Sequence, residues 1–127
     1  MRLPFERLQI WQKGMALAKL VYQLTRQFPK EELYGLTSQM RRSGISIPSN
    51  IAEGSQRTSD KEFSNFLLIA KGSLAELKTQ ILLAQDFQYL NEADATSLLT
   101  HAEEIDKMLR AFYQKLTASR FPLPTSK

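Results

Sequence analysis

Apolar residues recur along most of the chain at alternating spacings of three and four positions, which place them on one face of an α-helix. The repeat in the last long segment comprises Ala95, Leu98, Ala102, Ile105, Leu109, Phe112 and Leu116. The preceding segment carries a matching repeat made of Phe63, Leu67, Ala70, Leu74, Leu77, Ile81 and Ala84. No stretch alternates apolar and polar residues for long enough to indicate a β-strand, so the pattern predicts an all-α protein.

Two further helices are expected in the first half of the chain, over residues 7–27 and 35–56. The first is apolar on two adjoining faces, one made of Leu8, Trp11, Met15, Ala18 and Tyr22 and the other of Leu17, Val21, Leu24 and Phe28. Pro29 ends this helix, because the residue before a proline avoids the helical conformation. The second helix has small and polar residues between its large apolar ones, so its packing surface is expected to be small and polar.

The starts of the last two helices are marked by capping residues. Ser59-Asp60-Lys61-Glu62 has the composition of a capping box, and Asn91 is a favoured N-cap residue. These signals place the helices at residues 60–88 and 92–118. Helices joined by short connections must alternate in direction. The sequence therefore predicts one domain, residues 1–127, folded as an up-and-down antiparallel four-helix bundle.

The third helix carries more apolar surface than one small bundle can cover. Phe66, Ile69, Leu83 and Phe87 form a second apolar set beside its core repeat, and the first helix is also apolar over more than one stripe. Contiguous exposed apolar surface usually marks an interface. We therefore expect the protein to associate with copies of itself.

Composition and charge narrow the class of protein. The 127 residues include 17 Lys and Arg and 13 Asp and Glu, for a net charge of +4, and 43% are apolar, as is typical of globular proteins. With no Cys in the sequence, disulfides, thiolate metal ligands and thiol nucleophiles are excluded. The longest apolar run, Phe66 to Ala70, is far too short to span a membrane, and charged residues near the N-terminus argue against a secretory signal. We expect a cytoplasmic protein with no membrane partner.

The sequence lacks the common motifs for catalysis. His101 is the one histidine, and the chain holds no Glu-x-x-His motif for a carboxylate-bridged metal pair. It also lacks a P-loop and a Gly-x-Gly-x-x-Gly motif, so neither common phosphate-binding loop is present. We expect a protein that is not an enzyme and that uses no cofactor or metal ion.

The segment from Ser38 to Gly54 is expected to be helical although it contains a proline. Pro48 lacks a backbone donor and its ring presses on the carbonyl of Gly44, so a kinked helix is expected. At about 100° per residue, a continuous polar face follows the helix. Its members are Arg42, Ser46, Ser49 and Glu53.

Two interpretations of this face remain open. In the structural one, Arg42 and Glu53 pair with neighbours and Asn50 makes a hydrogen bond across the bundle. In the functional one, Arg41 and Arg42 bind phosphate groups, while Ser46, Asn50 and Glu53 hold the arginines in place. The other cationic candidates for nucleic-acid binding are Arg57, Lys13, Lys19 and Lys61.

Several blocks of the sequence resemble a bacterial protein family. They are Trp11-Gln12-Lys13, Phe28-Pro29-Lys30-Glu31-Glu32, Tyr34-Gly35-Leu36-Thr37-Ser38-Gln39-Met40-Arg41-Arg42, Ser46-Ile47-Pro48-Ser49-Asn50-Ile51-Ala52-Glu53-Gly54 and Gly72-Ser73-Leu74-Ala75-Glu76-Leu77. In these blocks the chain resembles the intervening-sequence proteins, or four helix bundle proteins, some of which are encoded in insertions within 23S ribosomal RNA genes. It departs from them in having Ser55-Gln56 where an aromatic residue often follows Glu-Gly, and Gln88 where a glycine is common.

The resemblance implies an up-and-down bundle whose copies form a ring, typically of five subunits. The chain is similar also to the accessory variability protein of diversity-generating retroelements, a basic pentameric barrel that binds nucleic acid and a reverse transcriptase. The similarity implies a homo-oligomer, a pentamer in the typical case, with RNA or DNA as its partner. The alternative is a scaffold for protein–protein interaction whose arginines are structural and which binds no nucleic acid.

Overall fold

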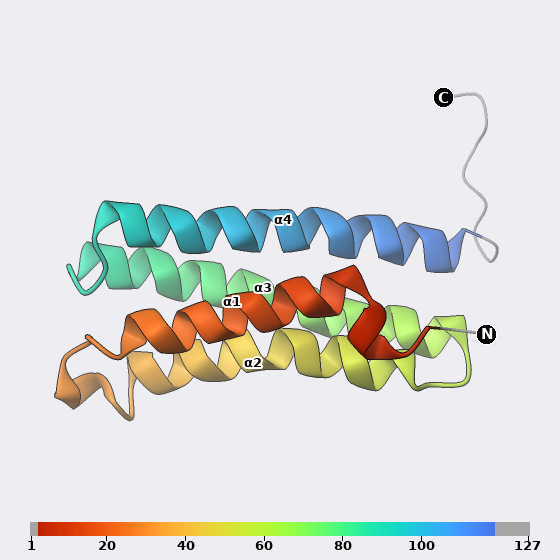
Figure 1. Cartoon of the computed structure of the whole chain (residues 1–127), viewed down its shortest axis with the longest axis horizontal. Coiled ribbons are helices and arrows are strands. Elements are labelled where there is room, and N and C mark those ends of the chain that lie inside the picture. The colour runs from red at the N-terminus through yellow and green to blue at the C-terminus, as the bar shows by residue number, and fades with distance from the viewer. Residues whose placement is uncertain (1–2, 119–127) are drawn as a thin grey trace, which may run out of the picture.

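The computed structural model describes residues 3–118, which form four long α-helices and no β-strand (Figure 1). The long helices are α1 (Gln9–Thr25), α2 (Leu36–Ser55), α3 (Asp60–Asp86) and α4 (Glu92–Thr117). Two short 3-10 helices, η1 (Phe5–Arg7) and η2 (Lys30–Glu32), precede α1 and α2. The α1–α2 and α3–α4 connections lie at one end of the molecule and the α2–α3 connection at the other (Figure 1). The described chain is therefore an all-α, up-and-down four-helix bundle.

The core is made by the apolar repeats of α3 and α4 together with one face each of α1 and α2. On α3 and α4 the members that are at most 1% exposed are Phe63, Leu67, Ala70, Leu74, Leu77, Ile81, Ala84, Ala95, Leu98, Ala102, Ile105 and Leu109. On the first two helices Leu17, Val21, Met40, Ile47 and Ile51 are fully buried. Burial of this continuous apolar surface is the main force that holds the four helices together.

The capping residues lie where the sequence places them. The Ser59 hydroxyl accepts a hydrogen bond from the Glu62 amide at 3.1 Å, and the Asn91 side chain accepts one from the Asp94 amide at 2.7 Å. Each bond satisfies a backbone donor that the first turn of a helix leaves without a partner. At the far end of α3, Gln88 has a φ of 65°, a left-handed conformation that favours glycine.

The first helix is shorter than the 7–27 range expected from its apolar pattern. Residues Phe5–Arg7 form η1 instead, and Leu8 is extended with φ −77° and ψ 124° before α1 begins at Gln9. The helix ends at Thr25, and the chain then turns through Phe28-Pro29 into η2. Apolar spacing continues through both turns, so it does not reveal where the backbone leaves the α-helix.

Helix α2 passes through Pro48 as one continuous helix (Figure 1). The proline lies against α1, where a Cβ on Gly14 would be 3.3 Å from the Pro48 Cβ. Gly44 also faces α1, since its Cβ would lie 3.6 Å from the Ala18 Cα. The two glycines thus allow the backbones of α1 and α2 to approach closely. No helix in residues 3–118 has the length and apolar character needed to cross a membrane.

Candidate nucleic-acid interface

Arg41 is held in a fixed position by two residues of α1. Its Nε donates a hydrogen bond to the Thr25 hydroxyl at 2.9 Å. Its guanidinium carbon also lies 4.4 Å from the centre of the Tyr22 ring, a cation–π distance. Thr25 is only 2% exposed and its own hydroxyl donates to the Val21 carbonyl at 2.7 Å, so the acceptor is itself rigid. The guanidinium group is therefore oriented before any ligand arrives.

Arg41 lies within a group of cations that we call the arginine site, comprising Arg26, Lys30, Arg41 and Arg42. Arg41 lines two adjoining surface pockets of about 570 and 390 Å³; Arg42 lines the larger one, and Arg26 and Lys30 the smaller. Among residues 3–118, no carboxylate lies within ion-pairing distance of these cations. The positive charge of the site is therefore not neutralised within the described bundle.

An exposed aromatic ring lies beside the arginine site. Tyr34 is 92% exposed and shares the larger pocket with Arg41 and Arg42. The nearby Glu32 is engaged elsewhere, since its carboxylate accepts hydrogen bonds from the Tyr89 hydroxyl at 2.9 Å and the Leu36 amide at 3.0 Å. That bond from Tyr89, aided by partial burial and the negative charge of Glu32, raises the pKa of Tyr89 above its ordinary value.

The other proposed cations do not join the arginine site. Lys13 pairs with Glu104 at 3.3 Å, and Arg57 pairs with Glu53 at 3.0 Å while stacking on the Phe66 ring at 4.7 Å. Lys61 is exposed near the start of α3, at the opposite end of the bundle, and Lys19 lines a groove on α1. The structure thus brings together only Arg41 and Arg42 of the six candidates named from the sequence.

The polar motif residues of α2 bond to partners other than Arg41 and Arg42, contrary to the functional interpretation of the sequence. The Ser46 hydroxyl bonds to the Ser73 hydroxyl of α3 at 2.8 Å, and Asn50 donates to the Ser46 carbonyl at 2.8 Å and its hydroxyl at 2.9 Å. Glu53 pairs with Arg57. These residues lie on the α3 side of α2, whereas Arg41 lies on the α1 side. The hydrogen bond across the bundle expected of Asn50 is made by Ser46 instead.

Thr25 and Tyr22, which hold Arg41, were not predicted from the sequence. A usable signal exists, because Arg41, Gly44 and Pro48 are spaced by three and four residues and so share one face of α2. Small residues on that face indicate contact with a neighbouring helix. Gly54 has a similar role toward α3, since a Cβ there would lie 2.6 Å from the Phe66 Cβ.

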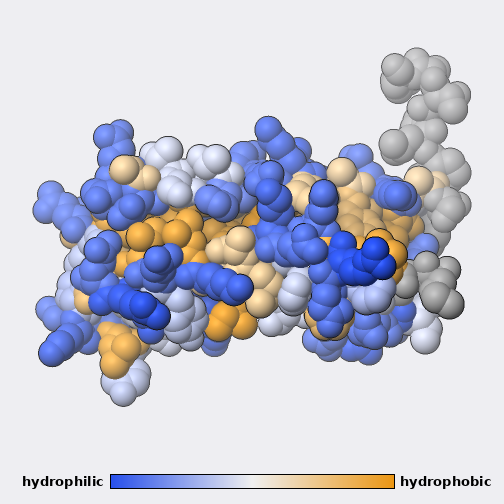
Figure 2. All heavy atoms as spheres, in the orientation of Figure 1, coloured by the Kyte–Doolittle hydropathy of each residue, from blue (hydrophilic) through white to orange (hydrophobic). Residues whose placement is uncertain are grey.

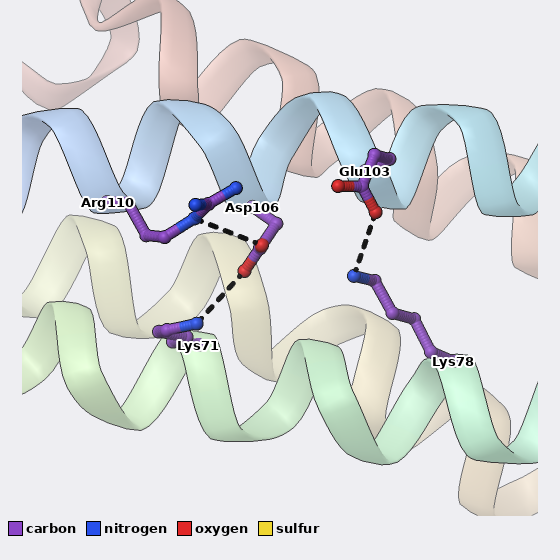
Figure 3. Close-up of polar contacts among 5 residues, drawn as sticks. All are labelled: Lys71, Lys78, Glu103, Asp106 and Arg110. Carbon is purple, nitrogen blue, oxygen red and sulfur yellow. Dashed lines mark hydrogen bonds and ion pairs between the residues drawn. The ribbon is translucent and has the colours of Figure 1, made fainter.

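The α3–α4 side of the bundle carries cations of a different kind. Lys71 and Arg110 both contact Asp106 at 3.3 Å, and Lys78 contacts Glu103 at the same distance (Figure 3). Figure 3 shows Asp106 of α4 lying between Arg110, on its own helix, and Lys71 of α3. Each of these cations has a carboxylate partner within the bundle, so this side offers less uncompensated charge to a polyanion.

A second surface feature, which we call the α1–α2 groove, has a volume of about 670 Å³. Its lining residues are Trp11, Met15, Ala18, Lys19, Tyr22, Gln23, Arg26, Ile45, Pro48, Ser49 and Ala52. Most of the lining is apolar, and Lys19 and Arg26 are its charged members. Of the first apolar face expected on this helix, all members but Leu8 line the groove. From the adjoining face, Leu17 and Val21 enter the core.

The described residues contain no group of three His, Asp or Glu side chains placed to hold a metal ion. His101 is half-buried on α4, and its Nδ1 lies 2.8 Å from the Ser97 carbonyl one turn earlier. This local hydrogen bond explains the orientation of the His101 ring, and no ligand is needed to explain it.

Fold and site together define a small four-helix bundle protein with an uncompensated cationic site at one end. The chain belongs to the 23S rRNA-intervening sequence protein family, whose model matches residues 6–111. It is similar to a crystal structure of a protein of unknown function from the S23 ribosomal protein family of Bacteroides thetaiotaomicron. The two chains share 25% identity with a TM-score of 0.75, over 83% of this chain and 98% of the other. No curated protein sequence matches the chain, and neither comparison indicates a catalytic family.

Proposed function

We propose that this protein is a cytoplasmic, non-enzymatic accessory protein that binds RNA or DNA as a homo-oligomer. The observation that carries the proposal is the guanidinium group of Arg41, which is oriented by Thr25 and Tyr22 and has no carboxylate partner in the described chain. An oriented guanidinium is well suited to a phosphate oxygen, because less side-chain entropy is lost on binding. Arg42, Arg26 and Lys30 line the two pockets that Arg41 shares and so extend the positive surface around it.

The arrangement favours single-stranded over duplex nucleic acid. The exposed ring of Tyr34 offers a face on which an unpaired base can stack, next to the cations that contact the backbone. In a duplex the base faces are covered by neighbouring bases, so Tyr34 contributes little there. The family link to ribosomal RNA intervening sequences supports RNA as the first ligand to test.

Self-association is part of the same proposal. Large apolar side chains of α3 are exposed beyond the core, with Ile69 at 51%, Leu83 at 41% and Phe87 at 54%. Figure 2 shows further hydrophobic side chains reaching the surface in a band between α4 and α1. A ring, of five copies as the sequence resemblance implies, multiplies the modest charge of each subunit and so strengthens the attraction for a polyanion.

The test is fluorescence anisotropy of labelled single-stranded and duplex RNA and DNA, titrated with nuclease-treated protein at several salt concentrations. We expect log K to fall linearly with log salt, and Arg41→Ala to lower the slope by about 1 and the affinity about tenfold. Lys78→Ala is the matched control, because Lys78 is paired with Glu103 on the opposite side. No binding at low salt by an intact oligomer would overturn the proposal.

The alternative is a protein-interaction scaffold with structural arginines. It is favoured by the apolar lining of the α1–α2 groove and by the bond that ties Arg41 to Thr25. In that case Arg41→Ala lowers the free energy of unfolding, and the anisotropy of labelled nucleic acid is the same with the variant as with the wild type. Because the bond to Thr25 is lost in either case, the anisotropy titration of Arg41→Ala, and not its unfolding, separates the two functions.

A further inference from the structure

The two pockets of the arginine site differ in what lines them. The smaller, of about 390 Å³, is lined by Arg26, Lys30 and Arg41, and we call it the cation pocket. The larger, of about 570 Å³, is lined by the exposed ring of Tyr34 and by Arg42, and we call it the aromatic pocket. Arg41 lines both, so the two pockets adjoin. Their volumes fall in the range of small-ligand sites.

The cation pocket gathers three positive side chains around one volume. Its other lining residues carry no charge; they are Thr25, Phe28, Pro29, Leu33 and Thr37. A phosphodiester within a strand has one negative charge, whereas a phosphomonoester at a strand end has about 1.5 to 2 at neutral pH and three terminal oxygens. A group of cations around one pocket is therefore complementary to a single phosphate of higher charge.

The Arg41 side chain has donors left for such a phosphate. Its Nε is used by the hydrogen bond to the Thr25 hydroxyl at 2.9 Å. Both terminal amino groups of the guanidinium remain, and no acceptor within residues 3–118 takes a hydrogen bond from them. Two parallel N–H groups of a guanidinium match two oxygens of the same phosphate.

A buried hydroxyl without a partner lies at the same pocket. Thr37, in the first turn of α2, lines the cation pocket and is only 3% exposed. Its hydroxyl makes no hydrogen bond within residues 3–118, and it is not among the side-chain atoms sealed from solvent. Buried hydroxyls are nearly always hydrogen-bonded, because burial without a partner costs free energy. A phosphate oxygen in the cation pocket would supply the missing acceptor.

We propose that the cation pocket binds the terminal phosphate of a nucleic-acid strand, while the base of the same end nucleotide stacks on Tyr34 in the aromatic pocket. This inference rests on the proposed nucleic-acid binding and specifies which part of the strand the arginine site takes. Arg41, which lines both pockets, contacts the phosphate from the side of the aromatic pocket. The ligand is a phosphomonoester on an unpaired end nucleotide, at either the 5′ or the 3′ end.

The first test is displacement of an internally labelled single-stranded RNA by unlabelled competitors of one sequence, followed by anisotropy. The competitors end in two hydroxyls, in a 5′-phosphate or in a 3′-phosphate. We expect the strand with the preferred terminal phosphate to compete about tenfold better than the hydroxyl strand. Free adenosine 5′-monophosphate should compete far more weakly, because it lacks the rest of the strand.

The second test removes the Thr37 hydroxyl with Thr37→Val, which keeps the shape of the side chain. We expect the preference for the phosphorylated end to fall several-fold, with affinity for the hydroxyl strand unchanged. Thermal unfolding should be nearly unchanged as well, since the hydroxyl has no partner within the described bundle. Lys30→Ala, at an exposed position of η2, should also lower the preference. Thr58→Val is the matched control, because Thr58 is exposed in the α2–α3 connection at the other end of the bundle (Figure 1).

The other outcomes overturn defined parts of the inference. Equal competition by all three strands would reject recognition of the strand end and leave nucleic-acid binding standing. No binding of the labelled RNA would reject both. Competition by adenosine 5′-monophosphate as strong as that of the phosphorylated strand would assign the pockets to a free nucleotide. A preference that is the same in Thr37→Val, Lys30→Ala and wild type would place the terminal phosphate outside the cation pocket.

Discussion

Helix α2 contacts α1 along one flank and α3 along the other, and the two contacts differ in how completely they close. Toward α3, Gly54 lies so near Phe66 that a Cβ would be 2.6 Å from its Cβ, and Ser46 bonds directly to Ser73 at 2.8 Å. Toward α1, the backbones meet at Gly14 and Gly44, but bulky side chains on the outside leave a groove of about 670 Å³.

The α3–α4 side of the bundle and the α1 side of α2 differ in how their charges are used. On the side of α3 that meets α4, Lys71 and Lys78 have carboxylate partners at 3.3 Å. On the α1 side of α2, Arg41 is oriented by a hydroxyl and a ring, neither of which cancels its charge. The comparison teaches that the contacts of α3 with its neighbouring helices close within the bundle, although its outer face stays apolar. The α1 side of α2 instead keeps positive charge available to a partner.

The largest expected effect comes from opening the closed flank with Gly54→Ala. The added Cβ would lie 2.6 Å from the Phe66 Cβ and 3.0 Å from the Phe63 Cδ1, so α2 and α3 must separate. Overpacking of this kind costs up to about 3 kcal/mol, and we expect the free energy of unfolding to fall by about that amount. Urea unfolding followed by circular dichroism measures it.

Gly72→Ala is the matched control for that substitution. Gly72 is an exposed residue inside α3, and a Cβ there meets nothing within 4 Å. Since alanine is the better helix former, we expect the free energy of unfolding to rise by about 0.7 kcal/mol. If both glycine substitutions stabilised the protein, the α2–α3 contact could not be as close as described.

The bundle could be predicted from the sequence because its determinants are local. The repeats of α3 and α4 and the caps Ser59 and Asn91 are each encoded within a few neighbouring residues, and periodicity carries them directly into the core. The true start of α1 was not predictable in this way. Its apolar spacing continues through η1, and the extended Leu8 depends on backbone turns that periodicity does not report.

The site was predicted only in part. The unusual segment around Pro48 predicts a site at Arg41 and Arg42, and these two residues line the same pocket. The residues that orient Arg41 were missed, because Thr25 lies 16 positions away on another helix. Periodicity tells which residues share a face of α2, but not which neighbouring helix that face meets. Ser46 and Asn50 were therefore assigned to the arginines, although they serve the α3 flank.

A second substitution tests the open flank by removing the acceptor of Arg41. Thr25→Val keeps the shape of the side chain but removes the hydroxyl that receives the Arg41 Nε and donates to Val21. We expect the free energy of unfolding to fall by about 1.5 kcal/mol and the affinity for single-stranded RNA to fall several-fold. Unchanged affinity, measured by anisotropy, would mean that Arg41 needs no orientation by α1.

The hydrogen bond between α2 and α3 is tested by a double-mutant cycle of Ser46→Ala and Ser73→Ala. Either single change removes the 2.8 Å bond between the two hydroxyls, so the second change should cost little more. We expect a coupling energy of about 1 kcal/mol in urea unfolding, with no effect on RNA affinity. Additive costs would show that the two hydroxyls do not stabilise the flank jointly.

The smallest expected effect is on the exposed ion pair of Lys78 and Glu103. This pair tests whether a cation with a carboxylate partner contributes less to RNA binding than Arg41, which has none. The partners are 29% and 55% exposed, so their coupling energy should be about 0.5 kcal/mol at most and should decline as salt is raised. Lys78→Ala should therefore leave stability nearly unchanged, and RNA affinity unchanged as well, because the lysine charge is already compensated. If Lys78→Ala weakened binding as much as Arg41→Ala does, uncompensated and oriented charge would not be what selects the binding flank, and general attraction to the whole positive surface would explain the affinity instead.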